Sequence, residues 1–409
     1  MEAEKIKILI VGHGAVASAL ARKLKQYDYV EKIFATGGLS SDTEIIDFRE
    51  DDLTGLLMFA LENKINLTIP VSEKALEADI VSFFQSNGQN IFGPTKDSCE
   101  FILNKILCKK FLYKIHAKTP KFGMYNKISQ ITDYLKNSSF PIILQTAQNS
   151  YMEDDKMVCP TLKSACNYLD KLFLKGETDV LIEEFTYGHN FTVYFITDGY
   201  SAIPLNIVGN YKFLKQNGGQ YTDGAGCYCP DYKIDETIKN KIRNIISDIL
   251  QNLDSRGCPY TGIIGIECVL TDENHFVVSD VKPFLQNHDS RAVLNLCEDD
   301  LIKIFNSCIN GFFSDEYDSI KINDYASVSL TVYFDKENKV LDFADSQDID
   351  FIEAIKKDDK NYSVIGANFT VTKTASTLTR TKKYLSDELE ELNIPEMKYR
   401  KDICANIKQ

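Results

Sequence analysis

IKILIVGHGAVASA, residues 6–19, is the stretch that reveals the architecture at the start of this chain. Its first half is a continuous apolar run that ends in glycine, and an Ala- and Leu-rich segment continues to Gln26. An apolar run of this kind is typical of a parallel strand that is buried on both faces. The stretch therefore predicts a strand, a glycine turn and a helix, the opening unit of a doubly wound α/β domain.

The glycine turn also fits the dinucleotide-binding pattern GxGxxA, from Gly12 to Ala17. Glycines at such a turn allow a phosphate group to approach the helix N-terminus. A nicotinamide-dependent oxidoreductase would carry an acidic residue at the end of the second strand. That strand ends with residues 34–38, FATGG, which contain no acid. A purely structural turn is therefore favoured, and an oxidoreductase remains the alternative.

Strand-like and helix-like segments alternate up to about residue 95, and the pattern then changes. In the first part we expect further strands at 32–35, 65–70 and 90–92 and a helix at 73–87. In the middle we expect helices at 97–116, 162–174, 236–253 and 300–309 and strands at 141–144, 180–185, 191–196, 263–270 and 275–282. In the tail we expect strands at 328–334 and 368–373 and a helix from Leu378, as in a small α+β unit.

The charge of the chain limits its partners. The formal net charge is −13, whereas non-specific binding to nucleic acid or to an anionic membrane needs a basic surface. No apolar run approaches the ~20 residues of a membrane span. A local basic pocket for a phosphorylated molecule is compatible with this charge. We therefore expect small-molecule partners, with no nucleic acid and no membrane.

The cysteines indicate the compartment. There are eleven of them, scattered, with no CxxC pair and no cysteine–histidine spacing of a zinc site. Free thiols in a reducing cytoplasm are the simplest interpretation. The chain opens with a short apolar strand rather than the pattern of a signal peptide. The expected location is cytoplasmic.

Two acidic residues lie on one predicted β-hairpin, whose strands are joined by the turn TDEN at 271–274. Glu267 lies on the first strand, and Asp280 and Lys282 share a face of the second because strand side chains alternate. Two acids on one face could hold Mg²⁺ and nucleotide phosphates. A buried ion pair with Lys282 and no metal fits the same residues equally well.

A third feature is the glycine-dense stretch GGQYTDGAG at 218–226. A loop of this composition can present backbone N–H groups to an anion. A flexible surface loop is the alternative. Both interpretations predict a loop at this position.

Taken together, these segments resemble the glycinamide ribonucleotide synthetase family, also called phosphoribosylamine–glycine ligases. The resemblance covers nearly the whole chain, because similar segments occur in the same order from end to end. They are ILIVGHG at 8–14, IFGPTK at 91–96, NK at 104–105, IEEF at 182–185 with Gly188, TDGAGCYCP at 222–230, YTG at 260–262 and YRKDI at 399–403.

The resemblance implies a mixed α/β and α+β fold of the ATP-grasp type. An N-terminal doubly wound, Rossmann-like domain would span residues 1–96. The ATP-grasp domain would span 97–322, with a small lid lobe at about 118–187. A small C-terminal α+β lobe would span 323–409.

The resemblance also implies a purine-biosynthesis ligase that uses ATP and Mg²⁺ to join glycine to phosphoribosylamine through glycyl phosphate. Nucleotide binding is expected at Lys105 and at an adenine hinge formed by Glu183, Glu184 and Phe185. Substrate binding is expected at Gly12, Gly14, Glu73, Lys212 and Asp289. Metal binding is expected at Glu267 and Asp280.

Several positions depart from the family pattern. A phosphate-binding lysine is replaced by Gln145, and the glycine-rich lid is replaced by residues 149–155, which carry three acids and no glycine. A metal-site asparagine is replaced by Lys282, whose ammonium cannot be a metal ligand while it is protonated. The other departures are Val16, Ala17, Ser18, Asn190 and Phe284. They support the alternative of a non-catalytic or substrate-shifted homologue that has lost normal ATP and Mg²⁺ binding.

Overall fold

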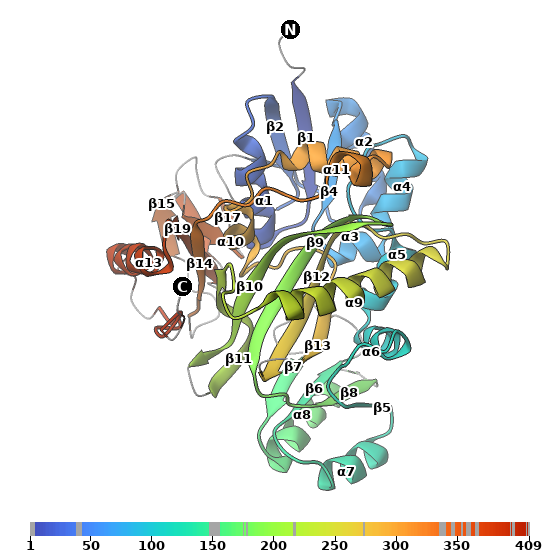
Figure 1. Cartoon of the computed structure of the whole chain (residues 1–409), viewed down its shortest axis with the longest axis vertical. Helices are drawn as coiled ribbons and strands as arrows, with labels where there is room; N and C mark the ends of the chain where they lie inside the picture. The colour runs from blue at the N-terminus through green and yellow to red at the C-terminus, as the bar shows by residue number, and fades with distance from the viewer. Residues whose placement is uncertain are drawn as a thin grey trace.

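The structure is a computed structural model of the 409-residue chain (Figure 1). It describes residues 5–37, 43–146, 156–174, 176, 179–215, 218–272, 275–334, 341–344, 348–352, 355–356, 361–364, 368–392, 394, 397–405 and 407. The expected lid at 149–155 lies outside these residues. Among the described residues, no helix has the length and apolar character needed to cross a membrane. All eleven cysteines are free thiols.

The N-terminal part is a parallel sheet with helices, as the opening stretch predicts. Its strand order is β3-β2-β1-β4, and every neighbouring pair is parallel. The strands are β1 (Ile6–Val11), β2 (Val30–Ala35), β3 (Glu44–Ile45) and β4 (Leu67–Pro70). The helices are α1 (Gly14–Lys25), α2 (Leu53–Asn63), α3 (Glu73–Glu77) and α4 (Ile80–Ser86).

Three local expectations were wrong here. The helix predicted at 73–87 is interrupted, because Asp79 takes a left-handed conformation between α3 and α4. The helix predicted at 97–116 is two helices, α5 (Lys96–Leu103) and α6 (Lys105–Lys114). Extended Asn104 separates them, and its side chain accepts a hydrogen bond from Leu107 N as the N-cap of α6. The strand predicted at 90–92 is only an isolated bridge between Thr68 and Ile91.

A large antiparallel sheet forms the centre of the molecule (Figure 1). Its strand order is β13-β12-β9-β10-β11-β14-β19-β16. The strands are β9 (His189–Asp198), β10 (Ala202–Lys215), β11 (Gly218–Cys229), β12 (Thr261–Asp272), β13 (His275–Lys282), β14 (Ala326–Val332), β16 (Ile349–Phe351) and β19 (Phe369–Ala375). The hairpin predicted at 263–282 is confirmed as β12 and β13.

The glycine-dense stretch is not a loop, which corrects both interpretations of it. It forms most of β11, which pairs with β10 on one side and β14 on the other. Glycine at position 224 allows the His288 ring to lie close to the strand, because a Cβ on Gly224 would lie 2.0 Å from Cγ of His288. Glycine in a strand is therefore a packing requirement here.

Two hydrophobic cores cover the two faces of the large sheet, and β9 contributes to both. Phe191, Val193 and Phe195 lie in the core that includes the buried isoleucines of α9 (Glu236–Asp254). Tyr194 and Ile196 point the other way, into the core that includes Phe305. This alternation follows from the two-residue period of a strand. Phe305 lies in α11 (Leu301–Asn310), which contacts α12 (Phe313–Glu316), and α10 (Ser290–Leu294) contributes to the same core.

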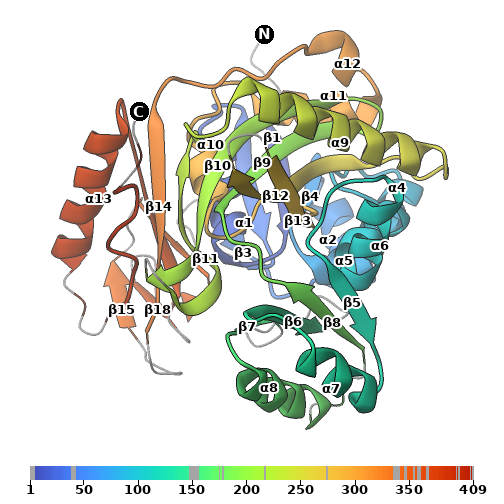
Figure 2. The same cartoon turned by 60° about the horizontal axis from the view of Figure 1, so that its bottom comes forward.

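A small lobe lies apart from the large sheet at the lower end of the molecule (Figure 2). Its antiparallel sheet has the order β5-β8-β6-β7 and its own hydrophobic core. The strands are β5 (Phe122–Tyr125), β6 (Ile142–Thr146), β7 (Lys156–Cys159) and β8 (Val180–Glu184). The helices are α7 (Ile128–Lys136) and α8 (Leu162–Leu174).

The C-terminal part continues the large sheet through β14, β19 and β16, and α13 (Leu378–Leu392) packs beside it. A separate three-stranded sheet contains β15 (Leu341–Ala344), β17 (Ile355–Lys356) and β18 (Asn361–Val364). Because β14 pairs with β11, backbone hydrogen bonds cross the expected boundary at residue 322. The division into 1–96, 97–322 and 323–409 stays a prediction.

Candidate functional site between the two lobes

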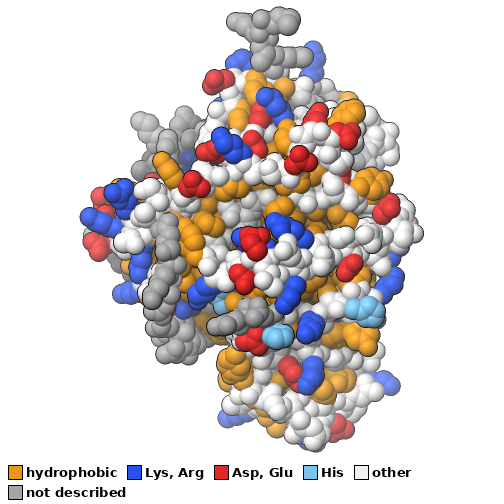
Figure 3. Space-filling model, in the orientation of Figure 1, with side chains coloured by type: hydrophobic (Ala, Val, Ile, Leu, Met, Phe, Trp, Pro, Cys, Tyr) orange, Lys and Arg blue, Asp and Glu red, His pale blue; other side chains and the backbone are white. Residues whose placement is uncertain are grey.

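Charged side chains from the small lobe and the large sheet meet at α6 and the β12–β13 hairpin. We call this group the lysine cluster: Lys105, Lys109, Lys156, Lys212 and Lys282 with Glu183, Glu267 and Asp280. On the face seen in Figure 3, by contrast, acidic and basic side chains are interspersed. The cluster is thus a concentration of lysines within a chain of net charge −13.

Asp280 is the central acid of the lysine cluster. It lies directly opposite Glu267 in the β12–β13 register. Its Oδ2 atom accepts hydrogen bonds from Lys105 Nζ at 2.6 Å and is 2.9 Å from Lys282 Nζ. Burial alone would raise the pKa of Asp280, but the charges of Lys105 and Lys282 outweigh it and hold the pKa well below its usual range. The predicted common face of Asp280 and Lys282 is confirmed.

Glu267 is paired with a lysine from the neighbouring part of the large sheet. Lys212 of β10 donates to its Oε1 atom at 3.0 Å, and both side chains are buried. Burial raises the pKa of Glu267, yet Lys212 and Lys282 lower it more, to about 2. Both hairpin acids are therefore ionised and engaged by ammonium groups.

Glu183 brings the small lobe into the same network. Lys109 Nζ lies 3.2 Å from Glu183 Oε2, and Gln145 Nε2 donates to Glu183 Oε1 at 2.8 Å. Lys109 also donates to the backbone oxygen of Ser279 at 2.6 Å, one residue from Asp280. These contacts connect α6, β6, β8 and β13. Lys109 escaped the sequence analysis because only the fold turns it towards the cluster.

Lys156 was also missed, although the register makes its place clear. It lies opposite Gln145 in the β6–β7 pair, so the two side chains share a face. Its Nζ atom is 5.4 Å from the ring centroid of Tyr221. Burial lowers the pKa of Lys156, but Tyr221 and then Asp280 outweigh this effect, so the pKa is raised.

The other residues of the expected hinge leave the small lobe at the end of β8. Glu184 is exposed, with its Oε1 atom 3.4 Å from Lys121 Nζ. The Phe185 ring lies edge-on to Phe213 of β10, with centroids 6.0 Å apart. The hinge segment therefore spans the gap between the small lobe and the large sheet.

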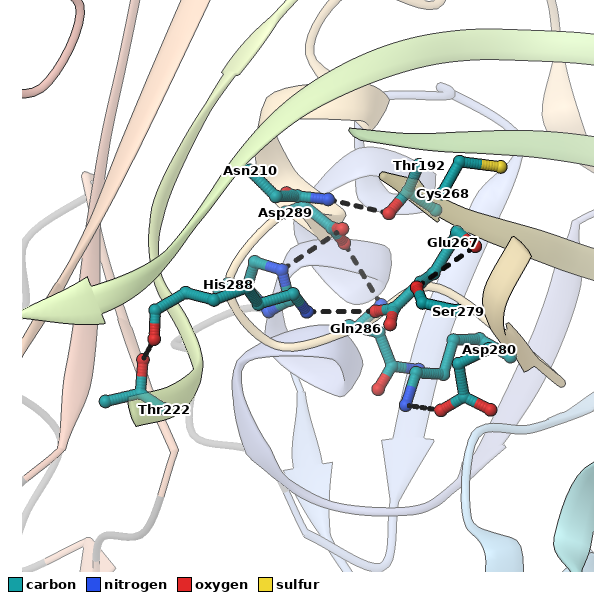
Figure 4. Close-up of polar contacts among 12 residues, drawn as sticks. Thr192, Asn210, Thr222, Glu267, Cys268, Ser279, Asp280, Gln286, His288 and Asp289 are labelled. Atoms are coloured by element: carbon teal, nitrogen blue, oxygen red, sulfur yellow. Dashed lines mark hydrogen bonds and ion pairs between the residues drawn. The ribbon is translucent and has the colours of Figure 1, made fainter. Parts of the chain in front are cut away.

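Asp289 lies close to the lysine cluster and is completely buried (Figure 4). It accepts hydrogen bonds from Tyr194 Oη at 2.8 Å and from Gln286 N at 3.1 Å, and His288 Nε2 is 3.5 Å away. Burial raises its pKa to about 7, although Tyr194 and Lys212 oppose the rise. Asp289 is thus an acid that can change its protonation state near neutral pH.

The glycine turn, residues 12–14, reaches this region through Asn287. The Oδ1 atom of Asn287 accepts a hydrogen bond from Val16 N at 3.1 Å. A Cβ on Gly14 would lie 2.6 Å from the same atom, and the φ angle of Gly14 is +83°. The turn and the segment 286–289 therefore fit against each other at the backbone.

Acidic and polar side chains border the glycine turn on its other side. His13 Nδ1 is 2.5 Å from Glu50 Oε1, and Ser72 Oγ donates to Glu50 Oε2. Burial raises the pKa of Glu50, but the hydrogen bonds from His13 and Ser72 outweigh it, and the pKa is lowered. Glu73 follows directly, in the first turn of α3. Glu50 lay in a stretch without a recognisable motif, so no sequence signal indicated it.

Family models match two thirds of the chain. The N domain of phosphoribosylglycinamide synthetase matches residues 6–101, and its ATP-grasp (A) domain matches residues 103–282. The chain belongs to the phosphoribosylglycinamide synthetase family. The resemblance recognised in the sequence is confirmed.

Full-length relatives agree with this family. The phosphoribosylamine–glycine ligase of Fusobacterium nucleatum is 28% identical, over 97% of this chain and 98% of its own length. The corresponding ligase of Caldanaerobacter subterraneus is 24% identical, over 98% of this chain and 100% of its own length.

Solved structures support the ATP-grasp fold. The phosphoribosylamine–glycine ligase of Thermotoga maritima superposes with a TM-score of 0.79 at 16% identity, covering 97% of this chain and all of that one. A second similar structure is the biotin carboxylase domain of Hydrogenobacter thermophilus 2-oxoglutarate carboxylase, which was solved with MgADP and bicarbonate. It superposes with a TM-score of 0.70 at 12% identity, covering 94% of this chain and 89% of that one. The mixed α/β and α+β fold class is therefore confirmed.

Proposed function

We propose that this synthetase-family chain is an ATP-dependent carboxylate–amine ligase that joins glycine to phosphoribosylamine. The observation that carries the proposal is the lysine cluster between the small lobe and the large sheet. Family membership provides the reaction class, and the cluster provides the chemistry that the reaction needs from the protein.

Charge is the first argument. Five lysines face three carboxylates, so the cluster keeps an excess of positive charge when all eight groups are ionised. An excess of buried positive charge is costly unless an anion joins it. Nucleotide phosphates are anions of the required size and charge, and fixed ammonium groups stabilise the charge that moves during phosphoryl transfer.

The position of Lys156 compensates for the replacement of a family lysine by Gln145. Gln145 is neutral where the family carries a phosphate-binding lysine, but Lys156 lies opposite it on the adjacent strand. The charge of Lys156 acts on Asp280, Glu183 and Glu267. We infer that Lys156 supplies the positive charge that position 145 lacks.

The remaining assignments follow the same arrangement. The adenine would lie at the hinge of Glu183, Glu184 and Phe185, with Lys105 at the phosphates. Phosphoribosylamine and glycine would lie between the glycine turn and the segment 286–289. That region includes the expected substrate residues Gly12, Gly14, Glu73, Lys212 and Asp289.

In the proposed reaction, a glycine carboxylate oxygen attacks the γ-phosphorus of ATP, and the bond to the β-phosphate oxygen breaks to release ADP. The amine of phosphoribosylamine then attacks the carbonyl carbon of glycyl phosphate. Phosphate leaves, the amine loses a proton, and the amide of glycinamide ribonucleotide forms. The role of the lysines is to hold the phosphates and to stabilise the transferred charge.

The test is product formation by the purified chain. ATP, glycine and freshly generated phosphoribosylamine should yield ADP, phosphate and glycinamide ribonucleotide, measured by mass spectrometry. Lys105→Met should weaken ATP binding by about 10- to 150-fold, since a hydrogen bond to a charged group contributes ~1.5–3 kcal/mol.

The matched control is Lys136→Met. Lys136 is also an ion-paired lysine, but it is 61% exposed at the end of α7. It should leave ATP affinity unchanged. If neither ATP nor ADP binds, or if phosphate release does not depend on glycine, the non-catalytic or substrate-shifted alternative replaces this proposal.

A further inference from the structure

Three ammonium groups surround the two acids of the β12–β13 hairpin. Lys105 Nζ and Lys282 Nζ both approach Asp280 Oδ2, at 2.6 and 2.9 Å. Lys212 Nζ lies 3.0 Å from Glu267 Oε1. All of these side chains are largely buried, so solvent screens the contacts little. The hairpin acids therefore already have cationic partners supplied by the chain itself.

This donor set does not fit a magnesium ion held by the protein. Mg²⁺ requires near-octahedral oxygen ligands at about 2.0–2.1 Å. Asp280 Oδ2 is engaged by two ammonium groups, and Asp280 Oδ1 accepts a hydrogen bond from Val281 N at 2.9 Å. Within the described part of the chain, no three acidic, histidine or cysteine side chains gather as a metal site.

Lys282 is the residue that replaces the metal-site asparagine of the family pattern. It lies on β13 two residues after Asp280, on the same face, and opposite Gly265 of β12. The Tyr194 ring packs against Gly265: a Cβ built on Gly265 would lie 2.6 Å from Tyr194 Cε1 and 3.4 Å, an ordinary contact distance, from Lys282 Cβ. The charge of Lys282 acts on Glu267 as well as on Asp280. Its ammonium lies beside Asp280, at 2.9 Å from Oδ2.

We propose that the Lys282 ammonium takes the place of a metal ion between the hairpin acids and the nucleotide phosphates. Nucleotide binding to this chain is then independent of protein-bound Mg²⁺. The inference rests on the proposed function, because it concerns the same nucleotide site. A tethered ammonium neutralises charge and donates hydrogen bonds to phosphate oxygens, but it cannot coordinate them.

The test compares ADP affinity in millimolar Mg²⁺ with ADP affinity in EDTA, by isothermal titration calorimetry. For the unmodified chain the two dissociation constants should agree within about threefold. For Lys282→Asn, which frees Asp280 and adds an oxygen ligand, ADP should bind about tenfold or more tightly in Mg²⁺ than in EDTA. Lys282→Arg retains the cation and should stay independent of Mg²⁺. Lys136→Asn is the surface control.

A second measurement does not depend on the folding of any variant. Mn²⁺ replaces Mg²⁺ in oxygen-ligand sites, and its electron paramagnetic resonance signal reports binding. Added to the unmodified chain with ADP, Mn²⁺ should bind no more tightly than it binds free ADP.

The outcomes separate the two proposals. If Mg²⁺ strengthens ADP binding to the unmodified chain about tenfold, or if Mn²⁺ binds the complex more tightly than free ADP, the inference is overturned and the proposed function stands. If ADP fails to bind under every condition, both are overturned. Equal affinities for the unmodified chain, with Mg²⁺ dependence in Lys282→Asn, support the inference.

Discussion

The lysine cluster and the glycine turn are linked through the segment 286–289, yet they are built by different means. In the cluster, buried charges from α6, the small lobe and the large sheet compensate one another over distances of 2.6–3.2 Å. At the turn, backbone geometry decides the fit, and His13, the partner of Glu50, is 57% exposed. A region held by buried charge tolerates the loss of an ion poorly, whereas a region held by backbone shape tolerates the addition of a side chain poorly.

The largest expected effect tests whether buried charge holds the lysine cluster together. Asp280→Asn leaves Lys105 and Lys282 close together without their shared carboxylate. Removing one member of a buried ion pair costs about 3–5 kcal/mol, so the free energy of unfolding in urea should fall by about this amount. Asp133→Asn, which removes an exposed pair with Lys136, should cost at most ~1 kcal/mol. Equal losses in the two variants would show that the cluster is not held by buried charge.

Asp289, between the two regions, provides a test by pH. Its pKa in the folded chain is about 7, above its ordinary value, so its contribution to stability is complete below about pH 4 and is lost as the pH rises to 7. Asp289→Asn removes this dependence. The stability of the variant relative to the unmodified chain should increase by about 2–4 kcal/mol between pH 4 and 8. Parallel stability curves, from chemical unfolding at each pH, would contradict the assignment.

The smallest expected effect tests whether backbone shape determines the fit of the glycine turn against the segment 286–289. Gly14→Ala puts a Cβ against Asn287 at a φ angle of +83°, and should reduce the free energy of unfolding by about 2–3 kcal/mol. Gly88→Ala is the matched control, because Gly88 has a φ angle of +71° with open space around it. It should cost only ~1 kcal/mol. The difference between the two variants measures the contact with Asn287, and a difference of zero would remove the link between the turn and the segment 286–289.

The sequence predicted the parts of the fold that depend on local pattern. The apolar run before Gly12 became β1, and the strands predicted at 263–270 and 275–282 pair as the β12–β13 hairpin. Residues 273 and 274 of the predicted turn lie outside the described residues. The common face of Asp280 and Lys282 followed from strand alternation, whereas a register shift between Glu267 and Cys268 brings Glu267 opposite Asp280. The stretch at 218–226 misled because glycine usually marks a loop, whereas here it makes room for His288 beside β11. Helix breaks at Asp79 and Asn104 were missed, since each depends on the conformation of a single residue.

By itself, the sequence determined the family and the ATP-grasp fold class, through the resemblance of its ordered segments to a known family. It also determined the hairpin that carries the two acids, because strands have a local pattern. Only the tertiary structure decided which lysines meet those acids. Lys105, Lys109, Lys156 and Lys212 come from α6, β7 and β10, and long flexible side chains from distant elements show no periodic signal. Their convergence depends on how the small lobe and the large sheet pack around α6, and that packing sets the balance of charge in the cleft.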